Sequence, residues 1–308
     1  MNRNETVNPM RTENAKQKEH LMRCLSFVGW LALVPSWIAI QVRAQDSPVA
    51  SPNEAVSANA KTSARFAAAE APRYDIRQTG KLDDALKLVS PPVLNWSNPT
   101  DGEVHGSVVF WTNNGCPEAA ASIYQFFDRK QVNVELVSLS ETPLRAMRND
   151  HLRWSPDAGV KFMAIPDSPV PADMPRARQL QMRAIARKFT GALADRGDDL
   201  TFSVLRLMDR PLYQYESSDG SKREGAVFAL VNTTDPEILL IIESRLTPNG
   251  REWLYAAARM HFCRLKLKLG DRVVWEVPQA APPWDKIRGP HGEYVILEWS
   301  SVEAAAAD

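Results

Sequence analysis

Residues 263–277, Cys-Arg-Leu-Lys-Leu-Lys-Leu-Gly-Asp-Arg-Val-Val-Trp-Glu-Val, alternate apolar and charged side chains around a Gly270-Asp271 turn. Alternation with a period of two is typical of antiparallel strands that bury one face. The apolar residues of both arms have odd numbers, and facing residues of paired strands lie on one side of the sheet. A two-residue turn would place Lys268 opposite Val273, so we expect a bulged loop of three or five residues.

The antiparallel pattern extends over residues 201–299. Turn signals made of Gly, Pro, Asn and Asp recur at intervals of about 8–12 residues, which is typical of a meander. Residues 252–269 contain no such signal, so we expect a bend or bulge near Arg259–Phe262, with a helix over Trp253–Met260 as the alternative. The candidate strands are Phe202–Met208, Leu212–Glu216, Ala226–Val231, Ile238–Ser244, Glu252–Arg259, Phe262–Leu269, Arg272–Val277 and Tyr294–Trp299.

The N-terminal half predicts one strand–helix–strand unit. Residues 107–112 have a strand pattern, and Cys116-Pro117-Glu118 followed by three alanines is typical of a helix start. We expect this helix to reach about Asp128 and the chain to return as a strand at 132–138. The expected fold class is α+β, with a dominant antiparallel meander sheet and two or three helices packed on one side.

Two further helices are expected, over residues 82–89 and 175–193. In the second, Arg176, Arg183 and Arg187 share one face. This face is a candidate for binding an anion or an acidic partner, and the alternative is a solvated face balanced by acids from elsewhere.

One short pattern occurs twice at a constant offset of 119 residues. It could arise from two strand exits with similar turn chemistry, or from an internal duplication. The matched residues are Gly106-Ser-Val108, Asn113 and Pro117-Glu118 in the first copy and Gly225-Ala-Val227, Asn232 and Pro236-Glu237 in the second.

Residues 23–45 indicate the compartment. Arg23 precedes an uncharged run over 24–42, and small residues precede Gln45 in the pattern that an export peptidase reads. We therefore expect residues 1–44 to be a signal peptide that directs the protein to the periplasm, cell envelope or exterior, with no stable membrane span after cleavage. An uncleaved anchor is the alternative, because the run is about long enough to span a bilayer.

The rest of the chain divides by composition. Residues 45–72 are an Ala/Ser/Pro-rich segment with few large apolar side chains, and we expect a disordered linker. Residues 73–301 are expected to form a single α+β domain, with 96–200 and 201–301 as possible halves. We expect residues 302–308 to be a disordered tail.

Charge and cysteine content exclude some classes of protein. The chain has 37 basic and 37 acidic residues, and removal of residues 1–44 leaves 31 against 34. This balance argues against a nucleic-acid partner. Of the cysteines, Cys116 and Cys263 remain, one expected at a rim and the other in an inward-facing row, so we expect no disulfide between them.

Five blocks of the chain resemble a family of uncharacterised secreted proteins from planctomycete bacteria. The resemblance runs from about Trp96 to Trp299 and implies an exported, lineage-restricted protein. It implies no catalytic residue, because no activity is established for that family. Arg commonly stands at the position of Cys116 in these proteins, which implies that the family does not depend on a thiol there. The blocks are GSVVFWTNNGCPEAAASIY, LRWSPDAGVKF, RARQLQMRAIARKFTG, LRLMDRPLYQYESSDG and REGAVFALVNTTDPEILLIIE.

Few residues suggest chemistry. Cys116, expected at a helix N-terminus, is the candidate nucleophile, but the second cysteine of a redox pair is missing. His261 and Cys263 have a spacing that metal ligands can use, yet no further ligands stand nearby, so no metal site is expected. His151 and Trp154 are candidates for lining a pocket.

The sequence contains no hydrolase motif and no phosphate-binding Gly-rich loop, and no cofactor is expected. The leading interpretation is a non-catalytic envelope or periplasmic protein that binds or scaffolds, with an envelope protein or a polysaccharide as its partner. The competing class is an enzyme with an unfamiliar site, either thiol-dependent at Cys116 or carboxylate-based in the loop-rich region 141–173.

Overall fold

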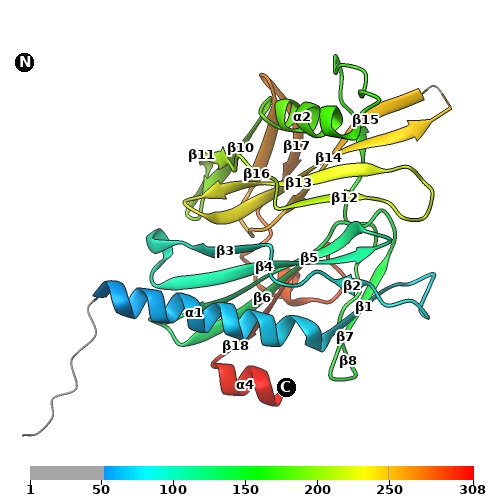
Figure 1. Ribbon diagram of the computed structural model, residues 1–308. Coiled ribbons are helices and arrows are strands. Elements are labelled where there is room, and N and C mark those ends of the chain that lie inside the picture. Colours follow the sequence, from blue (N-terminus) through cyan, green and yellow to red (C-terminus); the bar gives the residue numbers. More distant parts are fainter. Residues whose placement is uncertain (1–51, 249) are drawn as a thin grey trace, which may run out of the picture. The chain divides into compact units, whose positions relative to one another are not determined.

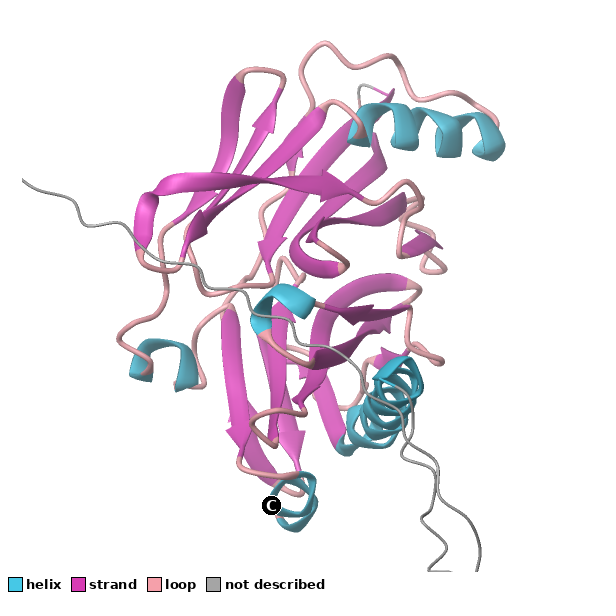
Figure 2. Ribbon diagram, turned by 90° about the vertical axis from the view of Figure 1, so that its left-hand side faces the viewer, coloured by secondary structure: helices cyan, strands magenta, loops and turns pink. Residues whose placement is uncertain are grey.

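The computed structural model describes residues 52–248 and 250–308. Strands make up nearly half of this part of the chain and far more of it than helices do (Figure 2), and every named strand pair is antiparallel, which confirms the α+β class with a dominant antiparallel sheet. The helices are α1 (Pro52–Glu70), α2 (Pro175–Ala186), α3 (Asp285–Arg288) and α4 (Val302–Ala307).

The strands form two large sheets and one small one. The first sheet has the order β18-β6-β5-β4-β2 with β3 beside β4, the second has the order β17-β16-β10-β11-β13-β14-β15-β9 with β12 beside β13, and the small sheet is β1-β7-β8. The strands are β1 (Tyr74–Gln78), β2 (Lys87–Leu88), β3 (Leu94–Ser97), β4 (Val104–Asn113), β5 (Cys116–Phe126), β6 (Gln131–Ser138), β7 (Leu144–Arg148), β8 (His151–Trp154), β9 (Met163–Ala164), β10 (Phe189–Asp195), β11 (Asp198–Leu207), β12 (Tyr213–Glu216), β13 (Glu224–Asn232), β14 (Asp235–Thr247), β15 (Gly250–Arg259), β16 (Leu265–Leu269), β17 (Arg272–Val277) and β18 (Tyr294–Trp299).

The two large sheets pack face to face, and each has its own helix on the outer face (Figure 1). Phe110 of the first sheet and Val227 of the second belong to the shared central core. Ala67 of α1 packs in the outer core of the first sheet, and Met182 of α2 packs in that of the second. The helices therefore lie on two different sheets, and the expectation that they pack on one side of a single sheet is wrong.

The structure supports the internal duplication. Strands β2 to β5 and strands β11 to β14 have the same pairing at a constant offset of 119 residues, including the hairpin and its bulge. Backbone hydrogen bonds before these strands repeat at the same offset, Val93 to Val108 as Leu212 to Val227. The equivalent pairs are Leu88↔Trp111 and Leu207↔Leu230, Trp96↔Gly106 and Tyr215↔Gly225, Thr112↔Pro117 and Val231↔Pro236, and Asn113↔Cys116 and Asn232↔Asp235.

The strand that follows each repeat pairs with the sheet that contains the other repeat. β9, which follows the first repeat, pairs with β15 of the second sheet, and β18, which follows the second repeat, pairs with β6 of the first sheet. The helix α2 and strand β10 belong with the second sheet, so the repeats have other boundaries than the proposed halves 96–200 and 201–301.

The helix predicted over 116–128 is wrong, because this segment is strand β5. Asn114 and Gly115 both have positive φ and form the two-residue turn of a hairpin, which is the conformation that Asn-Gly favours. The alanines are buried on both faces, since α1 covers one side and the second sheet the other. Small side chains are needed there, and tertiary packing overrides their helix propensity.

Several other predictions need correction. The linker prediction is wrong for 52–70, because helix α1 buries the small side chains of Ser63 and Ala67 against the first sheet. The predicted helix over 82–89 contains strand β2 instead, and the helix predicted over 175–193 ends at Ala186, where β10 soon follows. The tail 302–308 contains helix α4. Residues 1–51, including the predicted signal peptide, lie outside the described residues.

The hairpin at Gly270 keeps the apolar residues of both strands on one face, but it does so with a bulge inside the strands and not with a longer loop. Its turn has two residues and Lys268 does face Val273, so the predicted loop length is wrong. A bulge next to this pair then restores the common face, with Leu267 opposite Trp275. The chain also bends between β15 and β16 as expected, and the alternative helix over 253–260 is not formed.

Candidate functional site

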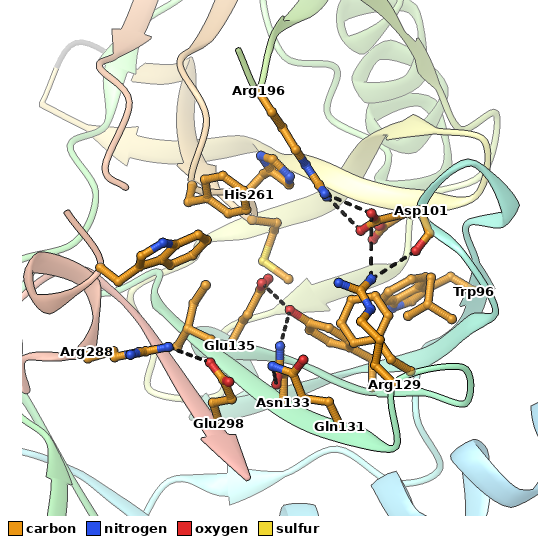
Figure 3. A pocket seen from close by; sticks show the side chains of 18 of the residues that line it. Trp96, Asp101, Arg129, Gln131, Asn133, Glu135, Arg196, His261, Arg288 and Glu298 are labelled. Carbon is orange, nitrogen blue, oxygen red and sulfur yellow. Dashed lines mark hydrogen bonds and ion pairs between the residues drawn. The ribbon is translucent and has the colours of Figure 1, made fainter. Parts of the chain in front are cut away.

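A cavity of about 440 Å³ lies at one end of the interface between the two large sheets (Figure 3). Its walls come from β3 to β6 and β18 of the first sheet, and from the start of β14 and the bend after β15 in the second. The loop before β4, the turns β5–β6 and β10–β11, and the segment 282–288 with α3 complete them. The lining residues are Trp96, Asp101, Val104, Tyr124, Phe126, Arg129, Gln131, Asn133, Glu135, Arg196, Asp235, Met260, His261, Phe262, Pro282, Trp284, Arg288, Ile296 and Glu298.

Aromatic rings form much of this wall. The ring centroid of Tyr124 lies 5.5 Å from that of Trp96 and 5.5 Å from that of Phe126. On the other side, Phe262 and Trp284 meet edge to face at 4.9 Å. Such rings offer flat apolar faces to a ligand.

Glu135 is the central polar group. It is only 6 % exposed, and its Oε1 accepts a 2.7 Å hydrogen bond from the Tyr124 hydroxyl, which in turn accepts one from Asn133 at 3.1 Å. Figure 3 shows the Glu135 carboxylate with Arg288 and Glu298 on one side and Asp101 and Arg129 on the other. Burial raises the pKa of Glu135 to about 7, against the effect of the Tyr124 hydrogen bond. Within residues 52–248 and 250–308, Glu135 forms no ion pair.

Two further acids lie close to Glu135. Asp235 accepts a 3.3 Å hydrogen bond from Asn98, and Glu237, at the β14 bulge, has a buried Oε2 without a hydrogen-bond partner among the described residues. Burial raises the pKa of both carboxyl groups, and the negative charge of Glu135 raises both further. The charge of Asp235 also raises the pKa of Glu237. The cavity is therefore deficient in positive charge at its buried end.

The arginines around the cavity already have acidic partners. Arg196 donates two hydrogen bonds to the carboxylate of Asp101, at 2.8 and 2.7 Å, and Arg129 donates to the Asp101 carbonyl at 3.1 Å. Arg288 pairs with Glu298 at 2.7 Å. These cations lie at the rim and are satisfied there, so they do not neutralise Glu135.

His261 is an uncharged member of the lining. Its Nδ1 accepts a 3.0 Å hydrogen bond from the backbone N–H of Cys263. Burial, with the nearby charges of Arg196 and Arg259, lowers the pKa of His261 to about 3. The imidazole is therefore neutral at physiological pH and can donate a hydrogen bond through Nε2.

The candidate nucleophile lies elsewhere. Cys116 is buried at the start of β5 in a hairpin, not at a helix N-terminus, and burial raises the pKa of its thiol to about 11. Cys263 is also buried, with a pKa raised to about 11 for the same reason, and both thiols are free. Burial and protonation both oppose a nucleophilic role for Cys116.

The other candidates do not meet in this cavity. His151 is exposed, whereas Trp154 is fully buried and donates a 2.8 Å hydrogen bond to the Gly292 carbonyl. On α2, Arg176 and Arg187 are exposed and Arg183 is half-buried, so the basic face is present on the helix surface and its role in binding stays a prediction. The buried arginine of this helix, Arg178, pairs with Glu224 and was not a candidate.

The described part of the chain holds no group of three or more His, Cys, Asp or Glu side chains arranged to bind a metal ion. None of its helices has the length and apolar character required to cross a membrane.

Sequence reasoning missed Glu135, Asp235 and Glu237. One signal was present, since Glu135 interrupts the apolar residues of a strand that is otherwise nearly continuous. Asp235 lies in a Thr-Asp-Pro sequence that by itself predicts only a turn. Nothing local indicates that this hairpin end of the second repeat faces a strand of the first.

Comparison of the chain with protein-family models, curated proteins and solved structures found no match. Fold and site together define its class: an internally duplicated α+β protein with two facing antiparallel sheets and an acidic, aromatic cavity at one end of their interface.

Proposed function

We propose that the protein is an exported, non-catalytic binding protein whose ligand occupies the cavity beside Glu135. The observation that supports this most is the combination of aromatic faces with a few buried hydrogen-bonding groups in one cavity. Its volume suits a small molecule or one unit of an envelope polymer. The N-terminal pattern of residues 1–44 and the resemblance to secreted planctomycete proteins support export to the envelope, periplasm or exterior.

Ligand binding can be tested with the full chain. Thermal-shift screening against small polar metabolites and envelope saccharides should give ligands whose stabilisation is lost in Trp284→Ala, because Trp284 lines the cavity and is partly exposed. Leu180→Ala is the control, since Leu180 is exposed on α2, away from the cavity. Ligands that stabilise both variants as they do the wild type would contradict the proposal.

Export has its own test. Protein recovered from the native envelope should begin at Gln45 and have the corresponding intact mass. A full-length species embedded in the membrane would show instead that the leader is retained as an anchor.

An enzyme that uses the buried carboxyl groups is the second candidate. A carboxyl group with a pKa of about 7, as in Glu135, is suited to donate or accept a proton near neutral pH. Ligands from the screen should therefore be incubated with the protein and followed by mass spectrometry. Turnover that is lost in Glu135→Gln would replace the binding function with this one.

A further inference from the structure

The duplication gives the cavity an equivalent at the opposite end of the same interface. At an offset of 119 residues, Tyr215 occupies the position equivalent to Trp96, and Gly225 occupies the position equivalent to Gly106 on the neighbouring strand. The two ends therefore have the same backbone frame, and differences between them come from side chains.

At that opposite end, a buried acid is neutralised by arginines of the protein itself. Glu243 is fully buried and accepts a 2.6 Å hydrogen bond from the Tyr215 hydroxyl. Arg223 donates to both of its oxygens at 3.0 Å, and Arg245 pairs with it from the other side. The Arg245 guanidinium also lies 4.0 Å from the centroid of the Phe162 ring. This end thus shows an acid, a tyrosine hydroxyl, an aromatic ring and a cation together.

The cavity end also has an acid, a tyrosine hydroxyl and aromatic rings, but no guanidinium pairs with its acid. The Arg129 guanidinium lies 3.7 Å from the centroid of the Phe126 ring and pairs with Asp101 instead. The positions of Arg223 and Arg245 are taken by Val104 and Phe126, which carry no charge, and Tyr124 stands where Glu243 would be. The acid is supplied by Glu135 on the neighbouring strand, and it keeps a hydrogen bond from a tyrosine hydroxyl. Val104 is much shorter than Arg223 and so contributes space, and neither Val104 nor Phe126 gives the acid a counter-charge.

We propose that the ligand of this cavity carries an ammonium or guanidinium group, which pairs with Glu135 among the aromatic rings as Arg223 and Arg245 pair with Glu243. This inference rests on the proposed binding function and specifies its ligand class. A buried carboxylate gains most from a partner of opposite charge, and the rings of Trp96 and Tyr124 add cation–π attraction. An anionic ligand is disfavoured, because the rim arginines are already paired with Asp101 and Glu298.

The proposal has a consequence for pH. A cation binds the ionised form of Glu135, and the free protein holds this group with a pKa of about 7. Binding therefore releases a proton below pH 7, and affinity rises with pH until the carboxyl group is ionised. The ionised fraction of a group with this pKa changes about tenfold between pH 6 and pH 8, and affinity should change by about the same factor.

The test uses titration calorimetry of the full chain with benzamidine, which is cationic and flat, and with benzamide, its neutral analogue. We expect benzamidine to bind about tenfold more tightly at pH 8 than at pH 6, and benzamide to bind weakly at both. Glu135→Gln should remove most benzamidine affinity and its pH dependence. Glu276→Gln is the matched control and should leave benzamidine affinity unchanged, since Glu276 is paired with Arg264 and does not line the cavity.

A second variant tests the same inference while Glu135 is kept. Val104→Arg places a guanidinium at the position equivalent to Arg223, so it should occupy the site, exclude benzamidine and leave the fold intact by circular dichroism. Equal affinity for benzamide and benzamidine, or unchanged binding in Glu135→Gln, would overturn the cation inference.

These results separate the two levels of the proposal. Neutral or anionic ligands that depend on Trp284 but not on Glu135 would leave the binding function standing and refute the cationic class. If no ligand depends on Trp284 either, the binding function itself fails.

Discussion

Trp96 lies across Gly106 on the neighbouring strand so closely that a Cβ on the glycine would come within 2.4 Å of the indole ring. Tyr215 covers Gly225 in the second repeat in the same way, again at 2.4 Å. In both repeats the glycine lets an aromatic ring lie flat against the sheet at the interface. At the cavity end the Trp96 indole is held further by a 3.1 Å hydrogen bond to Ser122.

Gly106→Ala should therefore move Trp96 and destabilise the protein. Overpacking of this kind costs about 1–3 kcal/mol of unfolding free energy, to be measured by urea denaturation. The variant should also weaken any ligand that contacts the cavity. Gly80→Ala is the control, because a Cβ there meets no atom within 4 Å. Equal stabilities of the two variants would contradict the close contact of Trp96 with Gly106.

Strands β16 and β17 of the second sheet were predictable, because their sequences alternate apolar and charged side chains. Residues 116–126 were not, since a strand buried on both sides by α1 and the second sheet has no alternation and can contain helix-forming alanines. The site was less predictable still. Glu135 and Asp235 are 100 residues apart, and only the facing of the two repeats brings them together.

A buried ion pair connects α1 to the small sheet. Arg148 is fully buried and donates to the Glu70 carboxylate at 2.6 Å and to the Ala305 carbonyl of α4. Arg148→Ala should cost about 3–5 kcal/mol of unfolding free energy, because the buried Glu70 then keeps only its longer, 3.4 Å contact with Arg73. Arg77→Ala, which breaks the exposed pair with Asp75, should cost much less, because solvent screens that pair. Denaturant unfolding of both variants checks this difference, and similar losses would refute it.

Stability should fall as the pH rises from about 5 to 7. Glu135 has a folded-state pKa of about 7, above its unfolded value, so the folded protein binds more protons than the unfolded chain over this interval. The contribution of this one group is on the order of 3 kcal/mol. Glu135→Gln should reduce the pH dependence of the unfolding free energy measured in urea, and the remaining slope should come from Asp235 and Glu237, whose pKa values burial also raises. A slope unchanged by the substitution would show that the pKa of Glu135 is not raised in the folded protein.

The two described cysteines should be unreactive and unlinked. Burial raises the pKa of Cys116 and of Cys263 to about 11, so little thiolate is present at pH 8. Native protein should react slowly with a thiol reagent, and denatured protein rapidly at both positions. Non-reducing peptide mapping should then give two separately alkylated peptides. A linked pair would contradict the free thiols.

The arginines opposite the cavity allow a converse experiment. Arg223→Ala removes one of the two cations that pair with the fully buried Glu243, and it should destabilise the protein by about 3 kcal/mol or more. It also opens space at the position equivalent to the cavity. Methylguanidinium at millimolar concentration should then raise the melting temperature of Arg223→Ala, but not that of the wild type. Methylurea, which is neutral and similar in shape, should have no such effect. Rescue by the cation alone would show that this interface can hold an external guanidinium group between a buried acid and a tyrosine hydroxyl, which is the arrangement proposed beside Glu135. Rescue by both compounds equally would show instead that filled volume, and not charge, stabilises this end of the interface.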